Sequence, residues 1–219
     1  MGLVSKKFLF PVVLLGLALV CLVFSYQTIL IESGRFLAPE ATGKADVLIL
    51  EGTELIRERP VKVGMELLAS GQANRMVVVV HQDLAGGQIF ALQNYARLVA
   101  KDLEALGLRT DQFQVIEVPA NHPITLTEAQ IALTNLSRSQ VRSVLLMADG
   151  FHARRSFWVY KQVGTPLGMK IFLYPYFAKY EMKAWWRTVD GRYDFIAESL
   201  KLFYYVIKGY IPVKSLFAT

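Results

Sequence analysis

The residues best suited to chemistry lie in one short stretch, FHARR at residues 151–155, which follows an apolar run and an Asp-Gly pair. His152 and Arg155 are three residues apart, so on a helix they share a face beside the unpaired N–H groups of the first turn. An imidazole, a guanidinium and a helix N-terminus together favour an anion, and His152 could give or take a proton. The alternative is that these side chains form an ordinary solvated surface.

The other histidines and several acids also follow predicted strands. Those residues are His81, His122, Glu51, Asp83 and Asp149, the last with Gly150 beside it. Because parallel strands end at one edge of a sheet, we expect these side chains to converge on one crevice. The remaining possibility is that the histidines cap loops without sharing a site.

Two chemistries fit such a crevice. In one, imidazoles and carboxylates hold a divalent metal ion that activates water. In the other, Arg154 or Arg155 and helix N-termini bind a phosphate while His152 acts as acid or base. No closely spaced ligand pair such as H-x-x-x-H occurs, which favours the metal-free site. The sequence does not identify a cofactor.

Short apolar runs alternate with helical patterns along most of the chain, as in a parallel sheet that is covered on both faces. The expected strands are residues 46–50, 75–80, 113–118, 144–148 and 170–174, and the expected helices include 54–70, 88–106 and 125–136. We therefore predict a three-layer α/β/α sandwich over residues 45–212, with a mostly parallel five-stranded sheet of Rossmann-like or flavodoxin-like type. Residues 213–219 are expected to be a tail.

The N-terminus carries an apolar segment that predicts a membrane anchor. Lys6 and Lys7 precede the apolar residues 8–24, and a bilayer is crossed by about 20 mostly apolar residues. Since no small-x-small cleavage site follows, we predict an uncleaved transmembrane helix over residues 1–31, with a cleaved signal peptide as the alternative. The lysines place the N-terminus inside and the domain outside the cytoplasm. Residues 32–44 are expected to be a linker.

Composition points toward anionic lipid or phosphate as partners. The net charge is +6 and the basic residues are scattered, without the dense clusters of nucleic-acid-binding proteins. The only cysteine, Cys21, lies in the apolar segment, so the rest of the chain has neither disulfides nor cysteine chemistry. Residues 184–212 mix Trp and Tyr with Lys and Arg, as at a membrane–water interface, although the aromatics could instead pack on the sheet.

The stretch LLMADGFHARRSFWVY, residues 145–160, resembles the strand, aromatic-His-x-x-Arg and helix signature of the YdcF/SanA/ElyC-like family of bacterial envelope proteins. A weaker similarity extends over residues 46–212. The resemblance implies a protein of the bacterial inner membrane, periplasmic apart from its anchor, that handles a phosphate-bearing lipid carrier or a peptidoglycan precursor. The alternatives are a non-catalytic binding or scaffold protein with a degenerate site, and a metal-dependent hydrolase.

The chain departs from the family pattern at several turns. Relatives carry a glycine-rich turn after the first strand and Ser-Gly-Gly after the second, where this chain has Glu51-Gly52 and a turn that begins at His81. Relatives also carry Asn-Thr-x-Glu-Asn after the third strand. Either Glu128 matches that Glu without its Thr, or Thr125 matches the Thr and Thr127 replaces the acid.

The residues expected to form the site follow from the strand ends and from the family resemblance. The sequence leaves open whether the site is catalytic. Arg59, or Arg57 in its place, matches the arginine that opens the first helix of the family. The catalytic candidates are His152, Arg155 and Glu128. The ligand-binding candidates are Glu51, Gly52, Arg59, His81, Asp83, Thr125, Asp149, Gly150 and Arg154.

Overall fold

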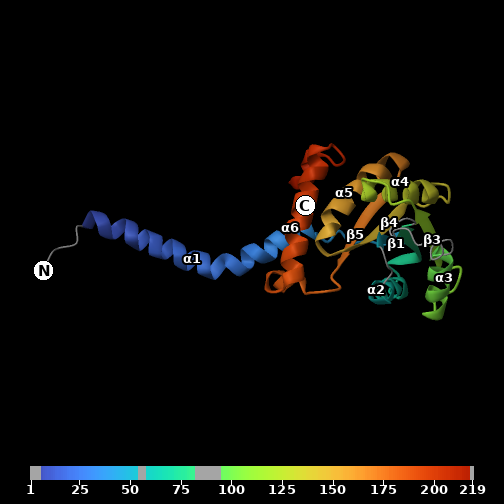
Figure 1. The fold of residues 1–219 in the computed structure, drawn as a ribbon, viewed down its shortest axis with the longest axis horizontal. Helices are drawn as coiled ribbons and strands as arrows, with labels where there is room; N and C mark the ends of the chain where they lie inside the picture. Colours follow the sequence, from blue (N-terminus) through green and yellow to red (C-terminus); the bar gives the residue numbers. More distant parts are fainter. Residues whose placement is uncertain (1–5, 54–57, 82–94, 218–219) are drawn as a thin grey trace.

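A five-stranded sheet forms the centre of the molecule in the computed structural model, which describes residues 6–53, 58–81 and 95–217 (Figure 1). Its strands are β1 Ala45–Thr53, β2 Ala73–His81, β3 Phe113–Val118, β4 Ser143–Asp149 and β5 Lys170–Tyr176. All neighbouring strands pair in parallel, in the order β3-β2-β1-β4-β5. The prediction of an α/β fold with a parallel sheet of Rossmann-like type is therefore confirmed.

Helices cover both faces of this sheet, which gives three layers. Helices α2 (Glu58–Ala69) and α3 (Tyr95–Ala105) lie on one face, and α4 (Ile124–Ser137) and α5 (Ala153–Gly164) on the other (Figure 1). Helix α6 (Val189–Ile207) packs beside α5.

Each central strand contributes side chains to the hydrophobic cores on both faces of the sheet, because successive side chains point to opposite faces. In β1, Val47 and Ile49 join the core under α4 and α5, while Leu48 and Leu50 join the core under α2 and α3. Strand β2 is buried from Met76 to its end at His81, as its uniformly apolar sequence predicts. Strands β1, β2 and β4 are thus covered on both faces close to the edge where they end.

Several element boundaries differ from the sequence-based expectation. Strand β5 continues through Pro175 to Tyr176, which is tolerated because β5 is an edge strand. Helix α2 is described from Glu58, and residues 54–57, the expected first part of α3 and Asp83 lie outside the described residues. The expected tail includes the short 3-10 helix η4 (Val213–Leu216), whose Ser215 is fully buried.

The N-terminal helix α1 (Lys6–Leu37) projects from the domain and extends through residues 32–37 of the expected linker (Figure 1). Its end is anchored, because Leu37 is buried and Trp185 Nε1 donates a hydrogen bond of 2.8 Å to the Leu30 carbonyl. Within the described residues no single helix is long and apolar enough to cross a membrane. The parts Phe10–Val20 and Ser25–Leu37, bent by 50° relative to each other, meet that criterion only as a pair.

Candidate functional site

The FHARR stretch lies where the sheet reverses its winding direction. Strand β4 ends at Asp149, Gly150 turns the chain with a φ of +52°, and the 3-10 helix η1 (Gly150–His152) leads directly into α5. A residue with a Cβ is strained at this φ, which accounts for glycine here. Neighbouring strands β1 and β4 form the switch point of the sheet, where ligands bind in such folds.

His152 meets Glu51, the acid near the end of β1. The imidazole Nε2 lies 2.9 Å from Glu51 Oε1, and Ser156 Oγ donates to the same oxygen at 2.5 Å. Glu51 is buried, and within the described part of the chain its second oxygen, Oε2, has no hydrogen-bond partner. The His152 side chain is 24% exposed, so a ligand can reach it from solvent.

Arg155 is held from three sides inside the protein. Its Nε and Nη2 donate to Glu198 Oε2 at 3.1 and 2.9 Å, and its Nη1 donates to Thr125 Oγ1 at 2.8 Å. The guanidinium also lies over the Tyr205 ring, 4.8 Å from the centroid. Since its donors already have internal acceptors, Arg155 orients the other site residues.

The second nitrogen of His152 has two competing partners. Its Nδ1 lies 2.5 Å from Arg155 Nη2 and 3.3 Å from Glu198 Oε2. A neutral Nδ1 accepts from Arg155, whereas a protonated Nδ1–H must donate to Glu198 and release that contact.

The carboxylates of Glu51 and Glu198 shift the balance between neutral and protonated His152. Burial and the Arg155 charge both oppose protonation of His152, but Glu51 and Glu198 outweigh them and raise its pKa to about 9. For Glu198, burial acts against ionisation, yet the positive charge of His152 and Arg155 holds its pKa well below the usual range. The two carboxylates thus favour the imidazolium form of His152, in which the Arg155 contact to Nδ1 is released.

A second cluster lies beside the first and is centred on Glu128, which is 2% exposed. Its Oε1 accepts from Tyr160 Oη at 2.8 Å and from the Gly52 N–H at 3.0 Å, and its Oε2 lies 3.0 Å from His81 Nε2. Burial raises the pKa of Glu128 and the pKa of Tyr160. His81 Nδ1 is buried without a hydrogen-bond partner among the described residues.

Gly52 is required where the two clusters meet. A Cβ at this position would lie 2.8 Å from His81 Nε2 and 3.1 Å from Glu128 Oε2. The first turn of a Rossmann-like fold is where glycines bring backbone N–H groups to a phosphate. Here the Gly52 N–H is bound by the Glu128 carboxylate instead.

Arg154, predicted as a ligand-binding residue, points away from the cluster around His152. Its side chain is buried and points to the ends of the chain, donating to the Ser215 carbonyl at 2.9 Å and to the Phe36 carbonyl at 2.8 Å. It also lies over the Phe36 ring at 4.0 Å. One residue along a helix is a rotation of about 100°, which separates its direction from that of Arg155.

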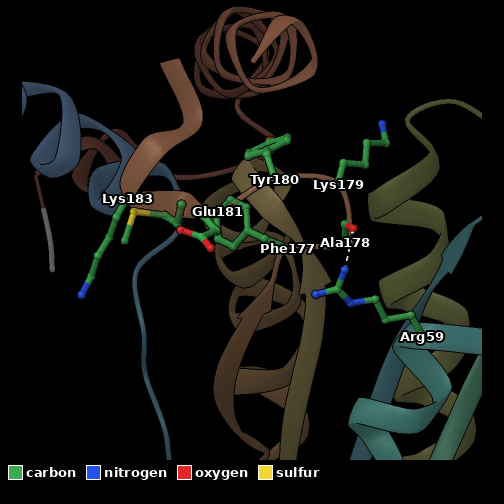
Figure 2. Close-up of a pocket in the computed structure, with 8 residues that line it drawn as sticks. Arg59, Phe177, Ala178, Lys179, Tyr180, Glu181 and Lys183 are labelled. Carbon is green, nitrogen blue, oxygen red and sulfur yellow. Dashed lines mark hydrogen bonds between the residues drawn. The ribbon is translucent and has the colours of Figure 1, made fainter. Parts of the chain in front are cut away.

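Arg59 contributes to a separate, open pocket of about 560 Å³ that residues 177–183 complete (Figure 2). Its Nη1 donates to the Ala178 carbonyl at 2.9 Å. In Figure 2, Lys179 and Lys183 point in different directions, so the cations do not converge on one anion. Arg59 thus ties α2 to the segment after β5.

The remaining candidates lie in the segments that follow β3 and β4. His122 is exposed in the loop before α4, and Asp149 is half-buried at the end of β4. The Gly150 turn lies against the segment after β5, since a Cβ on Gly150 would be 3.4 Å from Tyr180 Oη. Thr125 lies beside Arg155, and its Oγ1 accepts a hydrogen bond from the guanidinium.

The sequence analysis missed Ser156, Tyr160 and Glu198. Ser156 and Tyr160 follow His152 at intervals of four residues, which places all three on one face of a helix, and this spacing could have indicated them. Glu198 lies on the buried face of α6 together with Leu202 and Tyr205. No signal in the sequence marks Glu198, because α6 is apolar on two faces.

No protein-family model, curated protein or solved structure matches this chain. Among residues 6–53, 58–81 and 95–217, no three or more His, Cys, Asp or Glu side chains are placed to hold a metal ion. The fold and the site define a Rossmann-like α/β protein with a histidine–carboxylate cluster at its switch point.

Proposed function

We propose that this chain is an extracytoplasmic protein of the bacterial envelope, anchored by α1, that binds a phosphate-bearing, lipid-linked ligand. In this proposal the ligand occupies the crevice at the carboxyl edge of the sheet and His152 is its charged contact and proton donor. The observation that carries the proposal is the position of His152, which is partly exposed at the switch point and held by Glu51 and Glu198.

The charges around His152 support an anionic ligand. Arg155 and Glu198 neutralise each other, and Glu51 faces His152. The Lys201 ammonium, 2.8 Å from the other Glu198 oxygen, adds a positive charge at the solvent side.

The anchor is supported by the apolar surface of α1. Residues 10–20 of α1 are exposed, and most of them are Val and Leu, which are normally buried in a water-soluble domain. Lys6 and Lys7 precede this surface, and basic residues at that end place the N-terminus in the cytoplasm. The domain would then lie on the opposite side of the membrane.

A second candidate function is a non-catalytic scaffold in which the polar cluster only stabilises the fold. It is favoured by the internal pairing of Arg155 and by the Glu128 carboxylate at the Gly52 N–H. In that case the anion site of the fold is closed by the protein's own side chains.

Calorimetric titration separates the two functions. The full chain in detergent micelles is titrated with a short-chain isoprenyl phosphate, and the corresponding alcohol is the control ligand. We expect binding of the phosphate alone, weakened about ten- to a hundredfold by His152→Gln because a charge-assisted contact is lost. Arg109→Gln, which removes an exposed arginine paired with Asp111, is the matched control and leaves the affinity unchanged. Equal affinity in both variants, or no binding, favours the scaffold.

The orientation is tested separately with reporter fusions at Thr219. An enzyme reporter that is active only outside the cytoplasm should be active, and one that is active only inside should be silent. The reverse pattern contradicts the envelope location.

A further inference from the structure

Helix α6 has two apolar faces, and only one of them is covered by the protein. Its inner face carries Glu198, Leu202 and Tyr205, which are buried against the domain. Its outer face carries a continuous row of exposed apolar side chains, between 49% and 73% exposed: Val189, Tyr193, Ile196, Leu200, Phe203, Tyr204 and Ile207. Contiguous exposed apolar surface of this kind marks an interaction site.

The spacing of these residues makes the row a straight stripe. From Val189 to Ile207 the intervals are four, three, four, three and four residues, and Tyr204 lies beside the stripe. At about 100° per residue, all seven side chains fall within a sector about 100° wide. The stripe follows the whole helix, about 28 Å at 1.5 Å per residue.

We infer that this outer face of α6 lies on the lipid surface of the membrane that α1 enters, an inference that rests on the proposed anchor. The two helices are in contact, and Trp185, just before α6, donates to the Leu30 carbonyl of α1. In Figure 1, α6 runs across the end of α1 at a steep angle while α1 leads away from the domain. A bilayer penetrated by α1 therefore meets α6 along its length.

The charges beside the stripe indicate anionic headgroups as the partner. Arg192 flanks the stripe on one side, and Lys201 and Lys208 flank it on the other; all three are exposed. Asp190 and the half-buried Asp194 are the acidic exceptions; Asp190 lies in the first turn, where the helix dipole favours it. Apolar residues with Lys and Arg at the margins are typical of helices that lie in an anionic membrane interface. A second copy of this helix would bring like charges together.

The contact of α6 with lipid also bears on which ligands can reach the crevice at the carboxyl edge of the sheet. Glu198 contacts His152 from the inner face of the helix whose outer face touches lipid. The site would then lie about one helix diameter, roughly 10–12 Å, from the membrane surface. A lipid-linked phosphate would have to rise that distance above the headgroups to reach His152, with its chain still in the membrane.

Fluorescence quenching by lipid tests the inference in the full chain. Single labelling sites are made with Ile196→Cys or Leu200→Cys in a Cys21→Ser background, and an environment-sensitive fluorophore is attached. Asp111→Cys is the matched control, because Asp111 is an exposed residue of the loop before β3. The proteins are reconstituted in vesicles of phosphatidylcholine and phosphatidylglycerol that contain a spin-labelled lipid, and flotation measures their association with the vesicles.

We expect both stripe labels to be quenched several-fold more strongly than the control label, and less strongly in vesicles of phosphatidylcholine alone. Flotation with equal, weak quenching at all three positions overturns the contact of α6 with lipid and leaves the anchor in place. Failure to float overturns both. Disulfide formation between copies of the Leu200→Cys variant before labelling, with the stripe labels shielded from lipid, also overturns the inference, because the stripe then meets a second copy.

Discussion

Glu198 and His152 are 46 residues apart in the chain and meet at 3.3 Å between Oε2 and Nδ1. The same Glu198 oxygen accepts two hydrogen bonds from Arg155. One carboxylate of α6 therefore fixes both chemically important residues of the FHARR stretch. The last long helix of the chain is part of the site as well as a cover for the domain.

Glu198→Gln is predicted to destabilise the protein strongly. The substitution leaves the buried Arg155 charge without its counterion, which costs roughly 3–5 kcal/mol of unfolding free energy. Denaturant unfolding of the full chain in micelles, followed by tryptophan fluorescence, measures the loss. Lys201→Ala removes only the exposed partner of the same carboxylate and should cost about 1 kcal/mol or less. Similar, small losses of unfolding free energy in both variants would mean that Glu198 stabilises the fold no more than a surface ion pair does.

The stability of the protein is predicted to fall as the pH rises from about 6.5 to 9. The pKa of His152 is raised to about 9 by Glu51 and Glu198, against the opposing effects of burial and Arg155, whereas an unfolded histidine titrates near 6.5. Its protonated form therefore stabilises the fold fully below about pH 6.5, and this contribution, at most about 3 kcal/mol, is lost through pH 9. Thermal unfolding between these pH values should show the decline, and His152→Gln should reduce it. Parallel curves for the two proteins would contradict the raised pKa.

Arg154→Ala is predicted to loosen both ends of the domain. Two hydrogen bonds from this buried guanidinium hold the Phe36 and Ser215 carbonyls, and their loss should cost roughly 2–4 kcal/mol. Hydrogen exchange should become faster at residues 34–38 and 213–217. The control is Lys161→Ala in the same helix, since Lys161 is exposed. Unchanged protection at both segments would show that other contacts hold them.

Gly52→Ala is predicted to disturb the junction of the two clusters. The new methyl group would meet His81 Nε2 at 2.8 Å, and relief of that overlap should cost roughly 1–3 kcal/mol. Denaturant unfolding measures the cost, and titration with isoprenyl phosphate should show weaker binding. Gly16→Ala is the control, because a Cβ there meets nothing within 4 Å. Equal stability and equal affinity of the two variants would mean that the protein has room for a methyl group beside Gly52.

The sequence predicted the sheet because its signal is local. Runs such as residues 76–80 are apolar throughout, and this pattern occurs only where both faces of a strand are covered. The strand ends then predicted that Glu51, His81 and His152 would lie at one edge, and the structure brings Glu51 to His152 and His81 to Glu128.

The sequence could not predict which side chain each cation would meet. Arg154 and Arg155 are neighbours of the same type, and their directions depend on the exact start of α5 and on what packs there. Glu198 could not be assigned because α6 is apolar on two faces, so its periodicity does not show which face is buried. The extent of α1 depends on contacts such as that of Trp185 with Leu30, 155 residues away in the sequence.

The central claim, that His152 is a protonated contact for a phosphate, is tested most directly by NMR titration of its imidazole. The full chain is labelled with carbon-13 at histidine and titrated with and without a short-chain isoprenyl phosphate, and His152→Gln assigns the signal. The account predicts a pKa of about 9 in the free protein and a higher pKa in the presence of the phosphate, because the bound anion favours the imidazolium. A pKa near the ordinary 6.5 that the phosphate does not move would contradict it.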